Sequence, residues 1–176
     1  MLVRSIGRTA MVATLLSVVA TVGLASFSTA ALGSAEPGSD PVVEQKFAAD
    51  SGDFCLYGQV AGLLGWHLPP VGGPPTAVDV SGVLSDKPTA PITTPECGDD
   101  RRFTVVTLSA YTGGSPIDTE VVRADNGQRR FALTLTNETR RVPIDLVVVY
   151  VCRHSVATGQ LDYCGAKQVY RAPISL

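Results

Sequence analysis

The sequence predicts an all-β protein built as an immunoglobulin-like antiparallel β-sandwich of about seven strands with two disulfides. Three observations support this fold class. Beyond the first 50 residues, no long segment keeps apolar residues at helical spacing. Short runs that alternate apolar and polar residues recur between clusters of Gly, Pro, Asn and Asp. The four cysteines form no CxxC pair, which favours two disulfides over a metal site. A partly closed barrel is the alternative architecture.

The N-terminus has the layout of a secretory signal peptide. Arg4 and Arg8 precede an uncharged run, residues 9–35, that is rich in Ala, Val, Leu and Thr. Small residues close this run, so we expect cleavage after Ala30, with cleavage after Ala35 as the alternative. The apolar run also approaches the length of an uncleaved membrane anchor, which needs about 20 residues. The interspersed Thr, Ser and Gly favour the cleaved leader, residues 1–30.

Behind this leader we expect a flexible lead-in, residues 31–50, and a single β-sandwich domain, residues 51–176. The lead-in is predicted from its polar composition. The leader implies a secreted or cell-envelope protein that meets a membrane only transiently, through the signal peptide. The Ala- and Val-rich leader and the excess of Arg over Lys are typical of a high-GC bacterium.

Charge argues against nucleic acid as a partner. The chain has 14 basic and 16 acidic residues, a net charge of -2. Removing the leader removes Arg4 and Arg8, which leaves 12 basic and 16 acidic residues and a charge of -4. An acidic chain does not neutralise phosphates. We therefore expect the partner to be an unknown protein or surface ligand.

Alternation places seven strands along the domain. The clearest local signal is Asn126-Gly127, because these residues readily supply the positive φ values of a tight turn. Residues 125–128 are therefore expected to join two strands as a hairpin, residues 119–124 with residues 130–136. The expected strands are Phe54–Val60, Ala77–Leu84, Phe103–Tyr111, Thr119–Ala124, Arg130–Thr136, Pro143–Cys152 and Gln168–Ile174.

The four cysteines lie in the exported part of the chain, where oxidising conditions favour disulfides. Four cysteines allow three pairings, and the sequence alone does not choose between them. We expect Cys152 to pair with Cys164, closing a short loop, and Cys55 to pair with Cys97.

The strand that leads into Cys152 is apolar on both faces from Leu146 onward. One explanation is a central strand with both faces covered. The other is an exposed apolar stripe that binds a partner together with the adjoining loop. In the second case the candidate partner-binding residues are Val147, Val149, Val151, Arg153 and His154.

Motifs for catalysis or metal binding are absent. The two histidines, His67 and His154, stand in no recognised ligand spacing and are typical of loops. There is no GxSxG motif, and Ser115 could meet His154 and Asp118 only through the fold. Its surrounding sequence, Gly-Gly-Ser-Pro, is typical of a turn. We therefore expect no catalytic residue, no metal ion and no cofactor.

Two stretches carry resemblances. "FALTLTNETRRVPIDL", residues 131–146, resembles strands of secreted bacterial immunoglobulin-like modules, which implies the sandwich architecture. "FCLYGQ", residues 54–59, is similar to a stretch in some small actinobacterial protease inhibitors. This second resemblance covers few residues, and the cysteine spacing of the chain departs from those compact inhibitors.

Three hypotheses follow for function. The first is an exported, disulfide-stabilised, non-enzymatic binding or surface-interaction module. The second is a secreted protease inhibitor that uses a disulfide-clamped loop, residues 153–163, because a clamped loop loses little entropy on binding. The third is a small secreted hydrolase.

Overall fold

The computed structural model describes residues 41–70, 72–87, 97–98, 100–137 and 142–173. These residues form nine β-strands and no helix, which confirms the all-β prediction. In chain order the strands are β1 Val42–Asp50, β2 Gly58–His67, β3 Ala77–Asp86, β4 Arg102–Thr112, β5 Ser115–Ala124, β6 Gln128–Thr136, β7 Leu146–Ser155, β8 Leu161–Cys164 and β9 Gln168–Arg171. No helix within the described ranges could cross a membrane. The expected signal peptide, residues 1–30, lies outside them.

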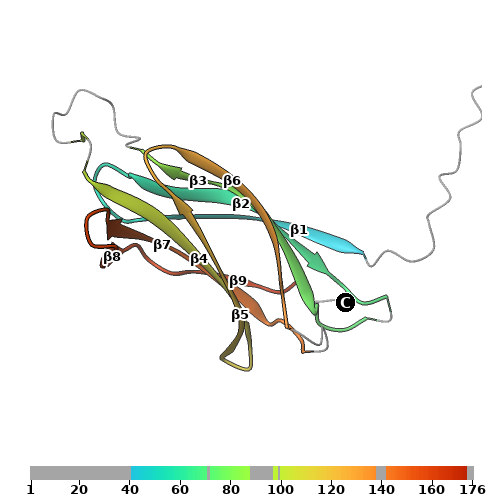
Figure 1. The fold of residues 1–176 in the computed structure, drawn as a ribbon. Helices are drawn as coiled ribbons and strands as arrows, with labels where there is room; N and C mark the ends of the chain where they lie inside the picture. Colours follow the sequence, from blue (N-terminus) through green and yellow to red (C-terminus); the bar gives the residue numbers. More distant parts are fainter. Residues whose placement is uncertain (1–40, 71, 88–96, 99, 138–141, 174–176) are drawn as a thin grey trace, which may run out of the picture. The chain divides into compact units, whose positions relative to one another are not determined.

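The strands form two antiparallel sheets (Figure 1). The first has the order β1-β2-β3-β6, and the second has the order β5-β4-β7-β8, with β9 also paired to β7. An immunoglobulin constant domain has strands A-B-E-D in one sheet and C-F-G in the other. Here β1, β2 and β3 follow one another within one sheet, so the strand order as a whole differs. The all-β architecture of two antiparallel sheets is present, and an immunoglobulin-like topology is not confirmed.

Both sheets contribute to one buried core, so they pack face to face. The inward side chains alternate along each strand, as the period of two in a strand requires. The core includes Leu64 and Trp66 from β2, Val78 and Leu84 from β3, Val106 and Leu108 from β4, Leu135 from β6, and Val147, Val149 and Val151 from β7.

A row of two phenylalanines and two glycines crosses the first sheet on its core face. Phe47 of β1 is opposite Gly62, Gly62 is opposite Gly82, and Gly82 is opposite Phe131 of β6. A Cβ atom at Gly62 would lie 2.0 Å from the carbonyl oxygen of Ser81 and 2.7 Å from a ring atom of Phe47. The rings from the two outer strands therefore lie over glycines of the central strands, where no other side chain fits.

The expected flexible lead-in is wrong for residues 42–50, which form β1. Its charged residues lie on the solvent face of an outer strand, while Phe47 and Ala49 point into the core. Polar composition alone therefore hid a strand whose inward positions are apolar. Strand β8 was also not predicted, and β2 begins at Gly58 and runs to His67, past the expected end at Val60.

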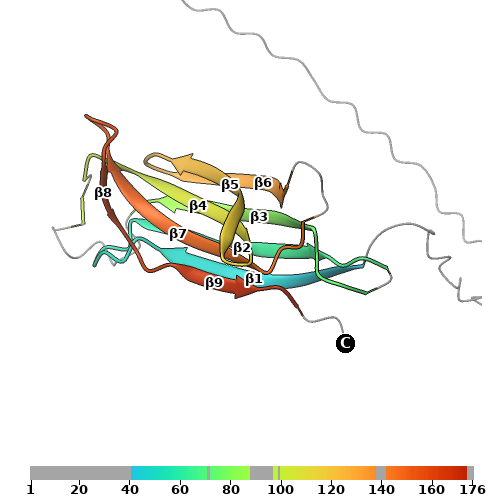
Figure 2. The same ribbon diagram turned by 90° about the horizontal axis from the view of Figure 1, so that it is seen from below.

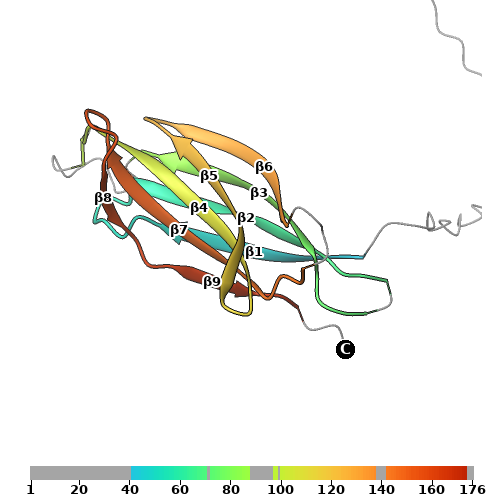
Figure 3. The ribbon, with the colours of Figure 1, turned by 60° about the horizontal axis from the view of Figure 1, so that its bottom comes forward.

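The expected hairpin around Asn126-Gly127 is also wrong. The turn is present, with a φ of 50° at Asn126, but β5 pairs with β4 while β6 pairs with β3. The connection therefore crosses from one sheet to the other (Figure 3). Asp86 at the end of β3 holds the turn: its backbone N–H donates to Gly127 O at 2.7 Å, and its carboxylate accepts from the backbone N–H of Asn126 at 2.8 Å.

The valine stripe is part of the core. Val147, Val149 and Val151 have no exposed surface, so the hypothesis of an exposed stripe is wrong. The physical reason is the place of β7, which lies between β4 on one edge and β8 and β9 on the other. Its inward face packs against the other sheet, and its outward residues Leu146, Val148 and Tyr150 are half-buried. The first explanation, a central strand, describes β7.

Candidate functional site

Arg153 lies on the core face at the end of β7, because it follows Val151 by two residues in the same alternation. Its side chain is 1% exposed. One terminal nitrogen, Nη1, donates to a carboxylate oxygen of Asp86 and to the hydroxyl of Thr104. The other, Nη2, donates to both carboxylate oxygens of Asp100 at 2.8 Å. Arg153 therefore joins the ends of β3, β4 and β7, and it is not the exposed contact residue that we expected.

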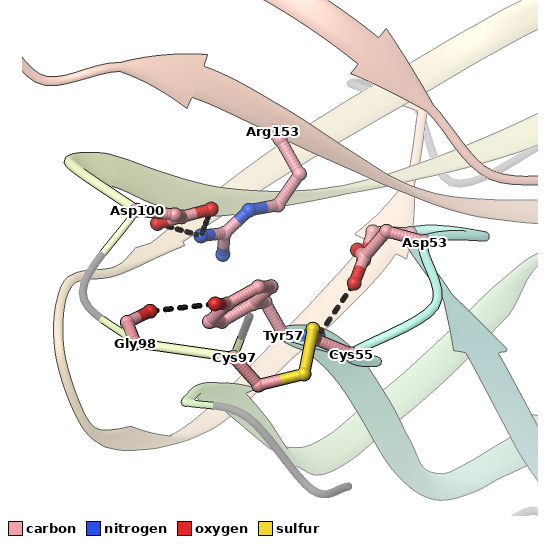
Figure 4. The surroundings of a disulfide bond; sticks show 8 residues. Asp53, Cys55, Tyr57, Cys97, Gly98, Asp100 and Arg153 are labelled. Atoms are coloured by element: carbon pink, nitrogen blue, oxygen red, sulfur yellow. Dashed lines mark hydrogen bonds and ion pairs between the residues drawn. A yellow bond between two sulfur atoms is a disulfide. The ribbon is translucent and has the colours of Figure 1, made fainter. Parts of the chain in front are cut away.

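Tyr57 completes this group, which we call the Arg153 cluster: Arg153, Asp86, Asp100, Thr104 and Tyr57. The guanidinium carbon of Arg153 lies 5.2 Å from the centroid of the Tyr57 ring. The Tyr57 hydroxyl donates to Gly98 O at 2.5 Å (Figure 4). The disulfide between Cys55 and Cys97, one of the two predicted pairings, joins the same two loops.

Electrostatics keep Arg153 charged. Burial by itself would lower its pKa, but the hydrogen bonds to Asp86 and Asp100 and the charges of these carboxylates outweigh burial, so the pKa is raised. A cavity of about 230 Å³ adjoins the cluster. Among the described residues nothing accepts a hydrogen bond from Arg153 Nε. The two terminal nitrogens of Arg153 are hydrogen-bonded to Asp86, Thr104 and Asp100. The Arg153 cluster therefore holds the loops around it in place.

The loop at the start of β2 is the most exposed apolar feature that the Arg153 cluster holds. Asp53 fixes its shape, since its backbone oxygen accepts from the N–H of Leu56 at 3.1 Å and its carboxylate accepts from the N–H of Tyr57 at 3.1 Å. Leu56 has a φ of 48°, a left-handed conformation that is uncommon for a leucine. Phe54 is 77% exposed and Leu56 is 37% exposed. Two apolar side chains therefore project from a loop with a fixed backbone.

The hairpin of β7 and β8 lies at the same end of the sheets as the start of β2 (Figure 1). Cys152 is opposite Cys164 in its ladder, and the predicted disulfide between them is present. Only residues 156–160 of the expected loop 153–163 lie outside the two strands. The N–H of Val156 donates to Arg101 O at 3.0 Å, which ties the turn to the loop before β4.

His154 is half-buried in β7, and its ring stacks on that of Phe103 with the centroids 5.2 Å apart. The expectation of a loop histidine is therefore wrong for His154, and it is also wrong for His67, which ends β2. Tyr163 lies on β8. Burial raises the pKa of Tyr163, and the charge of Asp53 raises it further.

The structure does not assemble Ser115 and His154 into a catalytic pair. Along β4, His154 is opposite Phe103, whereas Ser115 is opposite Thr112 at the other end of the strand. The nine residues from Phe103 to Thr112 correspond to about 30 Å of strand. Within the described parts of the chain, no group of three or more His, Cys, Asp and Glu side chains could hold a metal ion.

A second polar group lies on the outer face of the first sheet. His67 Nε2 lies 2.7 Å from a carboxylate oxygen of Asp79, and the hydroxyl of Thr134 donates to the other oxygen at 2.6 Å. The hydrogen bond from Thr134, followed by the contact with His67, lowers the pKa of Asp79 below 3.8 despite partial burial. The three residues lie on three neighbouring strands, so the group links β2, β3 and β6.

Because the folded-state pKa of Asp79 is lowered, its contribution to stability is present above pH 3.8 and is lost as the pH falls through the lowered value. We expect Asp79→Asn to lose less stability than the wild type between pH 7 and pH 3. Thr134→Val, which removes the largest cause of the shift, should flatten the profile in the same direction. Urea unfolding at the two pH values measures the difference, and identical pH profiles would contradict the assignment.

Sequence reasoning missed most of this site. The contacts of Asp86, Asp100 and Tyr57 with Arg153 were not predicted, because these residues are scattered along the chain. One signal was available: the alternation of Val147, Val149 and Val151 continues to Arg153, so a buried stripe implies a buried arginine. A buried guanidinium requires carboxylate partners.

Comparison with known proteins gives no family: no family model matches the chain, and neither curated proteins nor solved structures give a significant match. The fold and the site define a class by themselves, an all-β protein of two antiparallel sheets with two disulfides. Disulfides of this kind are consistent with an oxidising environment.

Proposed function

We propose that the protein is an exported, non-enzymatic binding module whose contact surface is the loop of Phe54 and Leu56. The observation that carries the proposal is the exposure of Phe54 on a loop with a fixed backbone. A large aromatic side chain that is 77% exposed has an unfavourable contact with water that a partner would relieve. Aromatic residues are also enriched among the side chains that dominate binding energy at interfaces.

Rigidity makes such a loop a good binding element. The disulfide of Cys55, the two hydrogen bonds to Asp53 and the contact of Tyr57 with Arg153 fix the backbone on both sides of Phe54 and Leu56. A loop that is already ordered loses little conformational entropy when it binds. The Arg153 cluster thereby supports the proposed contact surface without touching the partner.

The inhibitor hypothesis now points to a different loop from residues 153–163. Arg153, the first residue of the proposed inhibitory loop, is buried and could not enter the cleft of a protease. The exposed loop of Phe54 lies inside "FCLYGQ", the stretch that is similar to part of some protease inhibitors. A protease is therefore one class of partner that the binding experiment has to include.

Affinity capture from the native extracellular medium tests the proposal. We expect the wild type to retain a defined protein partner, and Phe54→Asp to lose at least about tenfold in affinity, since a central aromatic residue contributes about 2 kcal/mol or more. Val121→Asp is the matched control, because Val121 on β5 is also exposed and lies away from this loop. Equal capture by the two variants would refute the assignment of the loop. Loss of activity of a captured protease would favour the inhibitor hypothesis.

A further inference from the structure

The outer edge of β1 is an edge of the first sheet. β1 ends the first sheet and pairs with β2 alone. In an antiparallel ladder, successive residues direct their backbone groups to opposite edges. The N–H of Ala48 donates to the Tyr170 hydroxyl at 2.9 Å, and this hydroxyl donates to Ala48 O at 2.8 Å. Ala48 therefore faces away from β2, and alternation places the backbone groups of Glu44 and Lys46 on the same outer edge.

Tyr170 closes only part of this edge. It belongs to β9 of the other sheet, which runs beside β1 (Figure 2), and its ring packs edge-on against Phe47 with centroids 6.2 Å apart. Its hydroxyl occupies the place at Ala48 that the backbone of a neighbouring strand would take. Within the described residues, no hydrogen bond reaches the outer backbone groups of Glu44 and Lys46, and both residues are exposed.

We propose that this edge pairs with the same edge of a second copy of the chain, antiparallel and with the two-fold axis at Gln45. In that register Glu44 of each copy is opposite Lys46 of the other. Each facing pair exchanges two backbone hydrogen bonds. Because Glu44 and Lys46 both point to the outer face of the sheet, each pair also brings opposite charges together, which stabilises a cross-strand pair.

The charge pattern selects this register. An axis at Glu44 would bring two glutamates face to face, and an axis at Lys46 would do the same with two lysines. Like charges directly opposite each other are destabilising. A symmetric pairing needs a surface that is complementary to itself, and Glu44 and Lys46 on either side of Gln45 provide it.

Tyr170 limits the strength of the association. Pairing beyond Glu44 would set Val42 of one copy opposite Ala48 of the other, but the Tyr170 hydroxyl already occupies the backbone groups of Ala48. The ladder is therefore short, and the contact falls below the 1,200 Å² or so that a stable interface buries. The dimer is weak and forms at high protein concentration. Without the hydroxyl the ladder gains two more facing pairs.

Sedimentation equilibrium of the purified protein over rising concentration, at low salt, tests the proposal. We expect Lys46→Glu and Glu44→Lys each to weaken dimerisation by about tenfold, because attraction becomes repulsion in both pairs. The double variant Glu44→Lys with Lys46→Glu restores the opposite charges and should dimerise like the wild type. Tyr170→Phe should tighten the dimer by about tenfold or more, as the ladder lengthens.

Arg130→Glu is the control for net charge, because it makes the same change at an exposed site on β6, the opposite edge strand of the first sheet. It should dimerise like the wild type. A double variant as weak as the single variants would overturn the register. A wild type and a Tyr170→Phe variant that both stay monomeric at millimolar concentration would overturn the pairing altogether. Neither result bears on the loop of Phe54, which lies outside β1.

Discussion

Arg153→Met is expected to lower the free energy of unfolding by about 3 to 5 kcal/mol, because it leaves the carboxylate of Asp86 buried without a cation. Methionine is close in length to the arginine stem, so the loss comes from charge and hydrogen bonds more than from volume. Urea denaturation at pH 7, followed by far-UV circular dichroism, measures the change. A loss below about 1 kcal/mol would show that the Arg153 cluster is not a structural anchor.

Two further variants make this result specific. Arg130→Met removes an exposed arginine of β6 and should change stability by less than about 0.5 kcal/mol. Adding Asp86→Asn to Arg153→Met should recover part of the lost stability, because the uncompensated charge disappears. The amide oxygen can accept from the backbone N–H of Asn126, and the amide NH2 group can donate to the hydroxyl of Thr104. If the double variant loses the sum of two single losses, the two residues do not act as an ion pair.

Gly62→Ala is expected to cost about 3 kcal/mol or more, at the upper end for an overpacked core. The new Cβ atom would lie 2.0 Å from the carbonyl oxygen of Ser81, so the backbone of β3 has to move, and Phe47 has to leave its place above the glycine. The same denaturation experiment measures the loss, and near-UV spectra report the packing of the aromatic rings.

Gly127→Ala is the matched control for this glycine. A Cβ atom there would lie 3.9 Å from its nearest neighbour, the carbonyl oxygen of Asp125, and the backbone of Gly127 is not in the left-handed region. We expect its stability to be unchanged or slightly increased, since alanine restricts the unfolded chain. Equal losses in the two variants would mean that the close approach at Gly62 is not what makes glycine necessary there.

Local patterns were sufficient for part of the fold. Alternation located all or part of seven of the nine strands. The two expected disulfides, Cys55 with Cys97 and Cys152 with Cys164, are present, although the sequence alone did not choose among the three possible pairings. Which strands pair with each other could not be predicted from local patterns, as the turn at Asn126-Gly127 demonstrates. A turn signal fixes the local backbone, but Asp86, 40 residues earlier, decides where the next strand goes.

The site was harder to predict for the same reason. Facing side chains of β7 can be listed from sequence, but whether a face is covered depends on the neighbouring strands and the opposite sheet. The valine stripe and Arg153 therefore appeared as a candidate surface although they are core. Phe54 was assigned to a strand, and its exposure follows from the loop that Asp53 and the Cys55 disulfide define. The disulfide and the packing of the sheets join distant residues, and such contacts leave no local pattern in the sequence.

The crossing turn between β5 and β6 has a consequence for how the chain folds. The chain leaves the first sheet after β3, returns to it for β6 and leaves it again before β7. Neither sheet is therefore formed by one continuous segment of the sequence. Neither sheet can be completed before strands of the other sheet have formed. Assembly depends on contacts between distant residues, which slows folding. Neither sheet is stable without the other, so we expect the two sheets to fold and unfold in a single cooperative transition.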